Sequence, residues 1–123
     1  MINSTSMKKP ILITKDLFFI SKVREVAVAL GSELSVVRSS TSLEAAIEGA
    51  AGEPLFLIDL EKPGIELPTL AAALAPHLAQ GAPCASFFSH VHENVALQAA
   101  ELNLGEVMPR SRFVKVLPEL LKL

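Results

Sequence analysis

The chain has 123 residues, half of them hydrophobic, and a formal net charge of −2. This length suits one domain with a proper core, and the slightly acidic balance gives no basic footprint for nucleic acid. No apolar run approaches the roughly 20 residues that cross a bilayer, and residues 1–9 lack the apolar centre of a signal peptide. We expect a cytoplasmic protein with a flexible segment over residues 1–9, one domain over residues 10–123, and no membrane or nucleic-acid partner.

Short apolar runs alternate along the chain with stretches whose apolar residues recur at helical spacing. The short runs predict five strands, over residues 11–14, 33–39, 54–59, 84–88 and 107–108. The longer stretches predict five helices, over residues 17–30, from 42 to about 49–52, from 68 onward, 91–102 and 113–123. Alternation with such short connections indicates an α/β fold with a parallel sheet and right-handed crossovers.

Capping and proline residues set the expected helix ends. Asp16 is expected to cap the first helix, and Thr41-Ser42-Leu43-Glu44 has the spacing of a capping box for the second. Pro76 is expected to kink or shorten the third helix. Residues 110–112 are expected to form a loop in which Ser111 caps the last helix.

Polar side chains follow four of the expected strands. Asp59 ends the most apolar run, PLFLID, and the other strands are followed by Lys15-Asp16, Ser89-His90 and Arg110. The carboxyl ends of parallel strands meet at one edge of a sheet, where ligands bind in folds of this class. We therefore expect these side chains to converge on one site around Asp16 and Asp59, the two aspartates of the chain.

The order of these elements and motifs resembles the receiver domain of bacterial response regulators, over about residues 9–123. ILITKD resembles the first strand of the family with its acidic pair, and LIDLEKPG resembles its phosphoacceptor loop. The resemblance implies a flavodoxin-like three-layer sandwich with strand order 2-1-3-4-5 and five helices. It also implies that a kinase phosphorylates the central aspartate beside Mg²⁺, with Asp59 as the phosphoacceptor-equivalent and Asp16 as the second member of the acidic pair.

Three functional positions of the receiver family differ in this chain. Lys15 stands where the first acid of the pair belongs. Phe88 stands at the hydroxyl position, with Ser89 one residue later. Pro109 stands at the position of the phosphate-contacting lysine, next to Arg110.

These differences predict a divergent, pseudo-receiver site. Lys15 removes one metal-ligand charge, and its ammonium is expected to pair with Asp16 and Asp59 in place of the metal. The resemblance then implies that Mg²⁺ is held weakly or not at all, and it leaves phosphorylation of Asp59 open. Ser89 and Arg110 remain the candidates for contacting a phosphoryl group.

Other kinds of chemistry compete with this one. His90 and His92 could join Asp16 and Asp59 in a transition-metal site, because imidazole suits such metals. Adjacent Ser89-His90 cannot act as nucleophile and base, and the chain has neither a nucleophile elbow nor a glycine-rich phosphate loop. We therefore do not expect an enzyme.

The first functional hypothesis is a stand-alone signalling module of the two-component, phosphorelay type that acts through protein–protein interaction. Its partner would be a histidine kinase or a downstream signalling protein, and a homodimer is an alternative. The resemblance implies a contact face on the fourth helix, fifth strand and fifth helix, where Leu104, Val114, Leu117 and Leu121 lie. The rival hypothesis is a flavodoxin-like protein that binds a small molecule, nucleotide or other anion through Arg110 and Arg112.

Overall fold

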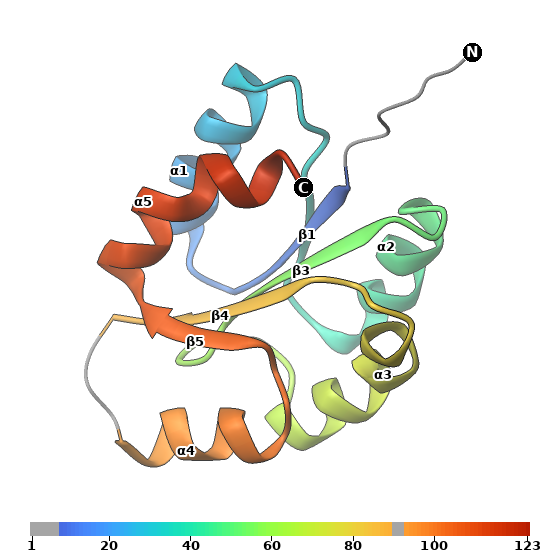
Figure 1. Ribbon diagram of the computed structural model, residues 1–123, viewed down its shortest axis with the longest axis vertical. Helices are drawn as coiled ribbons and strands as arrows, with labels where there is room; N and C mark the ends of the chain where they lie inside the picture. Colours follow the sequence, from blue (N-terminus) through green and yellow to red (C-terminus); the bar gives the residue numbers. More distant parts are fainter. Residues whose placement is uncertain (1–7, 90–92) are drawn as a thin grey trace.

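The computed structural model describes residues 8–89 and 93–123, which form a parallel sheet between two layers of helices (Figure 1). The strands are β1 (Lys9–Ile13), β2 (Ser35–Val37), β3 (Pro54–Asp59), β4 (Cys84–Phe88) and β5 (Glu106–Pro109). The helices are α1 (Leu17–Ala29), α2 (Leu43–Gly49), α3 (Leu67–Ala79), α4 (Glu93–Glu101) and α5 (Arg110–Leu121). The sheet order is β2-β1-β3-β4-β5. The predicted α/β sandwich and its strand order are confirmed.

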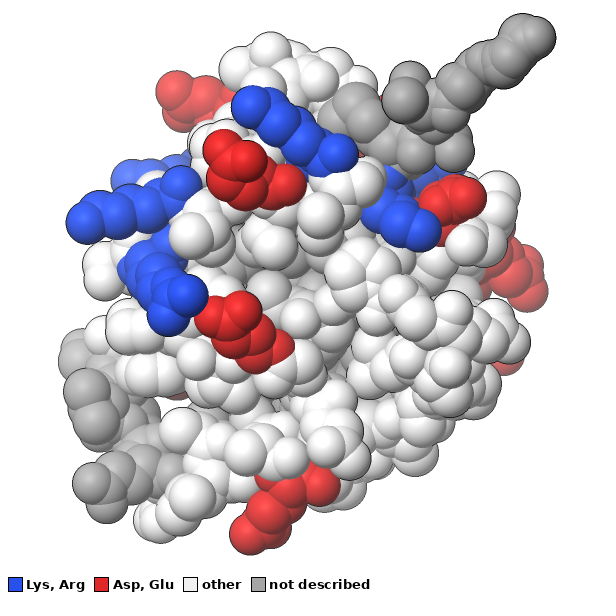
Figure 2. Space-filling view, in the orientation of Figure 1, with Lys and Arg blue, Asp and Glu red and all other residues white. Residues whose placement is uncertain are grey.

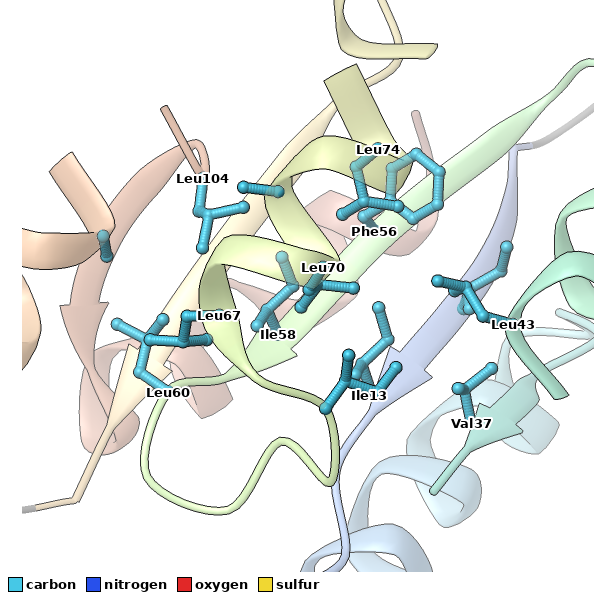
Figure 3. Packing of buried hydrophobic residues seen from close by; sticks show 14 of the residues in the cluster. Ile13, Val37, Leu43, Phe56, Ile58, Leu60, Leu67, Leu70, Leu74 and Leu104 are labelled. Carbon is cyan, nitrogen blue, oxygen red and sulfur yellow. The ribbon is translucent and has the colours of Figure 1, made fainter. Parts of the chain in front are cut away.

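The central strand β3 is buried on both faces, as its unbroken apolar run predicts. Phe56 and Ile58 belong to the core cluster shared with α2, α3 and α4, and Figure 3 shows them beside Leu70 and Leu74 of α3. Leu55 and Leu57 belong to the second cluster, which lies under α1 and α5. The two-residue period of a strand thus divides one apolar run between both layers.

The same alternation directs polar side chains at the ends of β1 and β3 toward the α1–α5 layer. Asp59 is two residues beyond Leu57, and Thr14 is two residues beyond Leu12, a member of the same core cluster. The register pairs Ile13 with Ile58, so Thr14 and Asp59 follow at adjacent positions. Both side chains are completely buried.

Helix α5 begins three residues earlier than its sequence predicts. Pro109 has extended backbone angles at the end of β5, and the helix starts immediately after it, at Arg110. The prediction of a loop over residues 110–112 is therefore wrong, and Ser111 does not cap the helix. Proline fixes the backbone angle before the first turn and offers no N–H group, so the strand passes directly into the helix.

Several smaller predictions about element ends are also wrong. Lys9 belongs to β1 rather than to a flexible segment. The side chain of Ser42 makes no capping hydrogen bond to α2, because a 3₁₀ turn precedes that helix. Pro76 does not shorten α3, which continues to Ala79. Pro76 has no N–H group to donate to the carbonyl of Ala72, one turn earlier. Both residues are exposed, so water can bind that carbonyl.

Gly64 lets the loop after β3 pass close to the end of β2. Its φ angle is +78°, and a Cβ atom added there would lie 2.2 Å from the carbonyl oxygen of Arg38. That distance is far below van der Waals contact, so a side chain at this position must displace the backbone. The loop that follows Asp59 therefore depends on glycine at residue 64.

We predict that Gly64→Ala lowers the free energy of unfolding by at least about 3 kcal/mol, because it adds a backbone clash to an unfavourable left-handed conformation. The matched control is Gly52→Ala, where φ is +82° but a Cβ atom would meet nothing within 4 Å. The control should lose only about 1–2 kcal/mol, the cost of the left-handed conformation. Urea unfolding of both variants checks this, and equal losses would contradict the proposed clash.

Candidate functional site

The carboxylate of Asp59 lies at the carboxyl edge of the sheet and is fully engaged by the protein. One oxygen, Oδ1, accepts hydrogen bonds from the backbone N–H groups of Glu61 and Lys62, at 3.0 and 3.1 Å. The other, Oδ2, accepts from the Thr14 hydroxyl at 2.8 Å and from the Arg110 guanidinium at 3.3 Å. A carboxylate offers about four acceptor positions, so all of them are used.

Asp16 is joined to the same network through Thr14 and through the start of α1. The Asp16 backbone N–H donates to the Thr14 hydroxyl oxygen at 3.0 Å. Its side-chain Oδ1 accepts from the backbone N–H of Phe19 at 3.1 Å, which is the predicted N-cap of α1. Thr14 therefore ties the two aspartates together: its hydroxyl donates to one and accepts from the backbone of the other.

Arg110 forms the third member of the site and contacts both carboxylates at once. One terminal nitrogen lies 3.2 Å from Asp16 Oδ2 and the other lies 3.3 Å from Asp59 Oδ2. The exposed fractions of the three side chains fall from 25% for Arg110 to 16% for Asp16 and zero for Asp59. The cation thus covers the buried acid, as a planar guanidinium with a fork of donors is able to do.

Two aromatic rings hold the guanidinium in place. The central carbon of the Arg110 guanidinium lies 4.1 Å from the ring centroid of Phe19 and 5.6 Å from that of Phe87. Both distances are within the range of a cation–π attraction. Phe87 is the residue paired with Asp59 across β3 and β4, so sheet register places the ring beside the acid that the arginine binds.

The same contacts lower the pKa of Asp16 below its usual value. The largest cause is the hydrogen bond from the backbone N–H of Phe19, which stabilises the ionised carboxylate. Partial burial acts in the opposite direction, and the hydrogen bond and charge of Arg110 lower the pKa further. Asp16 is therefore ionised at neutral pH and supplies a full negative charge for Arg110.

Lys15 does not take the position predicted for it. Its side chain is exposed, and within residues 8–89 and 93–123 it forms no ion pair with Asp16 or Asp59. Its backbone N–H donates to the carbonyl of Lys62 at 2.8 Å, which fixes the turn with the side chain facing outward. Arg110 provides the cation between the two carboxylates, so the predicted Lys15 pairing is wrong.

The other candidates make hydrogen bonds and ion pairs elsewhere or lie outside the described residues. Ser89 donates both its backbone N–H and its hydroxyl to Glu61 Oε1, the hydroxyl at 2.6 Å, and it lines the same groove as Asp16. His90 and His92 lie outside the described residues, so their predicted metal role stays a prediction. Arg112 is exposed and pairs with Glu106 at 3.0 Å.

The residues at this edge do not suit Mg²⁺, the ion that the receiver fold implies. Mg²⁺ needs clustered oxygen ligands with negative charge. Here the oxygens of Asp16 and Asp59 that face each other are both bound to Arg110, and position 15 is a lysine. In the described part of the chain, no group of three or more acidic, histidine or cysteine side chains could hold a metal.

Three residues of the site, Thr14, Phe19 and Phe87, have no site role in the prediction from sequence. The sequence pattern places Thr14 in the first strand and nothing more, although a lone hydroxyl among apolar strand residues is a signal, since buried polar groups need partners. Phe19 was one of two neighbouring phenylalanines, and the sequence could not tell which one turns inward. In the structure Phe19 is buried and Phe18 is 91% exposed.

Comparison with known proteins supports the fold. No protein-family model and no curated protein matches the sequence. Among solved structures, the chain is similar to a phosphorylated cyanobacterial phytochrome response regulator, RcpA, with 19% identity and a TM-score of 0.70 over 95% of this chain and 90% of that one. It is similar to a CheY-like receiver domain protein from Methanospirillum hungatei, with 16% identity and a TM-score of 0.70 over 94% of each chain.

These similarities confirm that the chain has the fold of response-regulator receiver domains, as ILITKD and LIDLEKPG predict. The low identity fits a divergent form. Among the described helices, none combines the length and the apolar character that a membrane span requires.

We predict that Arg110→Met lowers the free energy of unfolding by about 2–4 kcal/mol, because it leaves the buried Asp59 carboxylate without its cation. Methionine keeps much of the apolar stem, so the loss reports mainly the charge. The control is Arg112→Met, which removes an ion pair whose side chains are each 60% exposed and should cost less than about 1 kcal/mol. Chemical denaturation of both variants checks this, and similar losses would contradict a special role for Arg110.

We predict that Asp16→Asn destabilises the protein at neutral pH and has little effect in acid. The folded state lowers the pKa of Asp16, so its charge stabilises the fold above the unfolded pKa of about 3.9, and this contribution is lost as pH falls through the lower folded value. Asparagine keeps the capping oxygen and removes the charge. Unfolding curves of both proteins check this when they are recorded from neutral pH down to below the unfolded pKa of aspartate. A difference in the free energy of unfolding that does not change with pH would contradict it.

Proposed function

We propose that the chain is a receiver-like signalling module that acts by binding another protein, without enzymatic activity and without phosphorylation of Asp59. The observation that carries this proposal is the position of Arg110, whose guanidinium lies 3.2 Å from Asp16 and 3.3 Å from Asp59. A cation of the protein itself thus lies between the two acids that would otherwise face a metal ion.

The hydrogen bonds of Asp59 support this proposal. A carboxylate that accepts a phosphoryl group must attack with a free oxygen lone pair. Asp59 has two backbone donors on one oxygen and a hydroxyl and a guanidinium on the other, and its side chain has no solvent exposure. Transfer would have to break at least one of these contacts and open a buried site.

The charges at the site support it as well. Phosphoryl transfer depends on positioning and on neutralising the charge that develops on the transferred oxygens, a task that Mg²⁺ performs in most enzymes of this chemistry. Here the cations nearest the two acids are side chains, and the metal-ligand set is incomplete because Lys15 replaces an acid. Asp59 is better suited to hold Arg110 than to react.

The network also offers a reason for constitutive binding. Arg110 begins α5, Asp16 precedes α1 and Asp59 ends β3. The side chain of Arg110 therefore joins α5 to α1 and β3 at the same edge of the sheet. A switch requires two conformations that a modification favours differently. Because the cation that joins these elements is a side chain of the protein, the module keeps one conformation. Its partner recognises that conformation directly. We expect the partner to be a signalling protein, either a histidine kinase bound without phosphotransfer or a downstream protein.

The rival function, binding of a nucleotide or other anion through Arg110 and Arg112, receives less support. Arg110 is committed to two carboxylates and Arg112 to Glu106. An anion would have to displace an acidic side chain from each arginine.

We predict that incubation with acetyl phosphate and Mg²⁺ leaves the intact mass of the wild-type protein unchanged, because Asp59 is capped by four donors. Asp59→Asn provides the matched negative control. A stoichiometric phosphoryl adduct that disappears in Asp59→Asn would contradict the proposal.

The double variant Lys15→Asp/Arg110→Ala tests the same idea in the opposite direction. It removes the guanidinium that binds both carboxylates and replaces the positive charge at position 15 with a negative one, so we expect it to gain measurable Mg²⁺ binding by calorimetry. Wild-type protein that binds Mg²⁺ as tightly as the double variant would show that Arg110 does not exclude the metal.

A further inference from the structure

None of the four apolar side chains named for the predicted contact face is fully exposed, although Leu97 of α4, in the same region, is 61% exposed. Leu104, Leu117 and Leu121 are buried, and Val114 is partly covered. Phe18, at the start of α1, is instead 91% exposed, the highest value among the exposed large hydrophobic residues of the described chain. A single exposed phenylalanine is ordinary on a protein surface, and it points to a contact only where it borders a binding groove.

Phe18 forms part of the wall of an open groove between α1 and α5, with a volume of about 690 Å³. Phe18 and Lys22 are four residues apart and therefore lie on one side of α1. Val114 and Lys115 line the groove from α5. The groove thus combines an aromatic and an aliphatic side chain with one lysine from each helix. The paired side chains of Asp16 and Arg110 line it as well, so the two lysines carry its excess positive charge.

The groove is suited to negative charge. Lys22 and Lys115 are exposed, and neither forms an ion pair with a side chain in residues 8–89 or 93–123. Figure 2 shows Lys and Arg side chains gathered on the side of the molecule where α5 begins, at the left of the view. The first turn of α5 also borders the groove through Pro109 and Ser111. Pro109 makes no side-chain cap, and the N-terminus of a helix favours anions.

We propose that this groove binds an acidic segment of a partner protein, in which carboxylates flank an apolar side chain that packs against Phe18 and Val114. The proposal deepens the proposed function and rests on it for the premise that the module acts by binding a protein. Carboxylates of the segment would lie beside Lys22, Lys115 and the first turn of α5.

The shape and charge of the groove favour this occupant over two others. A membrane surface would meet a convex apolar face with several insertable side chains, whereas this site is hollow and has one protruding ring. A second copy of the chain related by two-fold symmetry would bring the same surface to itself. The lysines of one copy would then face those of the other, so like charges would oppose the contact.

The test uses a synthetic amphipathic peptide in which Glu residues flank Leu and Phe, and a second peptide with Lys in place of each Glu. Titration of the full chain, followed by NMR, should shift the backbone signals of Phe18, Lys22, Val114 and Lys115 with the Glu peptide, and added salt should weaken the effect. Phe18→Ser should reduce the affinity about tenfold or more. Val28→Ser, on the same helix at a residue that is 71% exposed and outside the groove, should leave it unchanged.

Charge reversal makes the test specific. Lys22→Glu/Lys115→Glu should exchange the preference, so that the Lys peptide binds and the Glu peptide does not. Four results would each overturn the proposal. The first two are equal binding of both peptides to wild type and signal changes away from the groove. The others are binding to anionic vesicles with none to the Glu peptide, and self-association through this face. None of these results depends on a phosphoryl adduct at Asp59, so failure of the groove and failure of the proposed function are distinguishable.

Discussion

One guanidinium lies between two carboxylates at the carboxyl edge of the sheet, and the arrangement of that edge depends on it. Asp59 is completely buried, and an isolated buried carboxylate is costly unless it is paired and hydrogen-bonded. Arg110 supplies the charge, while Thr14 and two backbone amides supply the remaining hydrogen bonds. Asp16 completes the network by binding the other end of the guanidinium fork.

This network changes what a receiver fold is able to do at its edge. A metal ion and a phosphoryl group are exchangeable, so they can report a signal. An arginine that is part of the chain cannot leave, and the rings of Phe19 and Phe87 hold it against the sheet. The physical consequence is that the positive charge between the two carboxylates comes from the chain itself. If binding is the output, a partner can be recognised at surfaces beside these ion pairs, such as the groove that Phe18, Lys22 and Lys115 line.

The fold and the place of the site could be predicted from the sequence because both follow from strong local patterns. An apolar run as short as PLFLID, between turn residues, favours a strand covered on both faces, and parallel strands bring their carboxyl ends to one edge. Asp16, Asp59 and Arg110 meet there for that reason.

The identity of the bridging cation could not be predicted in the same way. Lys15 is adjacent to Asp16 in sequence, but a backbone hydrogen bond to Lys62 turns its side chain outward. Arg110 faces inward because α5 begins at that residue, and Pro109 had suggested a loop instead. A small difference in where a helix begins decides which charge reaches the core, and local sequence patterns do not fix helix ends so closely.

The most direct test of the account is a crystal structure of the wild-type protein grown with Mg²⁺ and beryllofluoride, a stable mimic of a phosphoryl group on aspartate. The account predicts that both terminal nitrogens of Arg110 remain bound to Asp16 and Asp59, with neither metal nor fluoride at the site. A Mg²⁺ ion coordinated by the two aspartates, with beryllofluoride on Asp59 and Arg110 displaced, would contradict it.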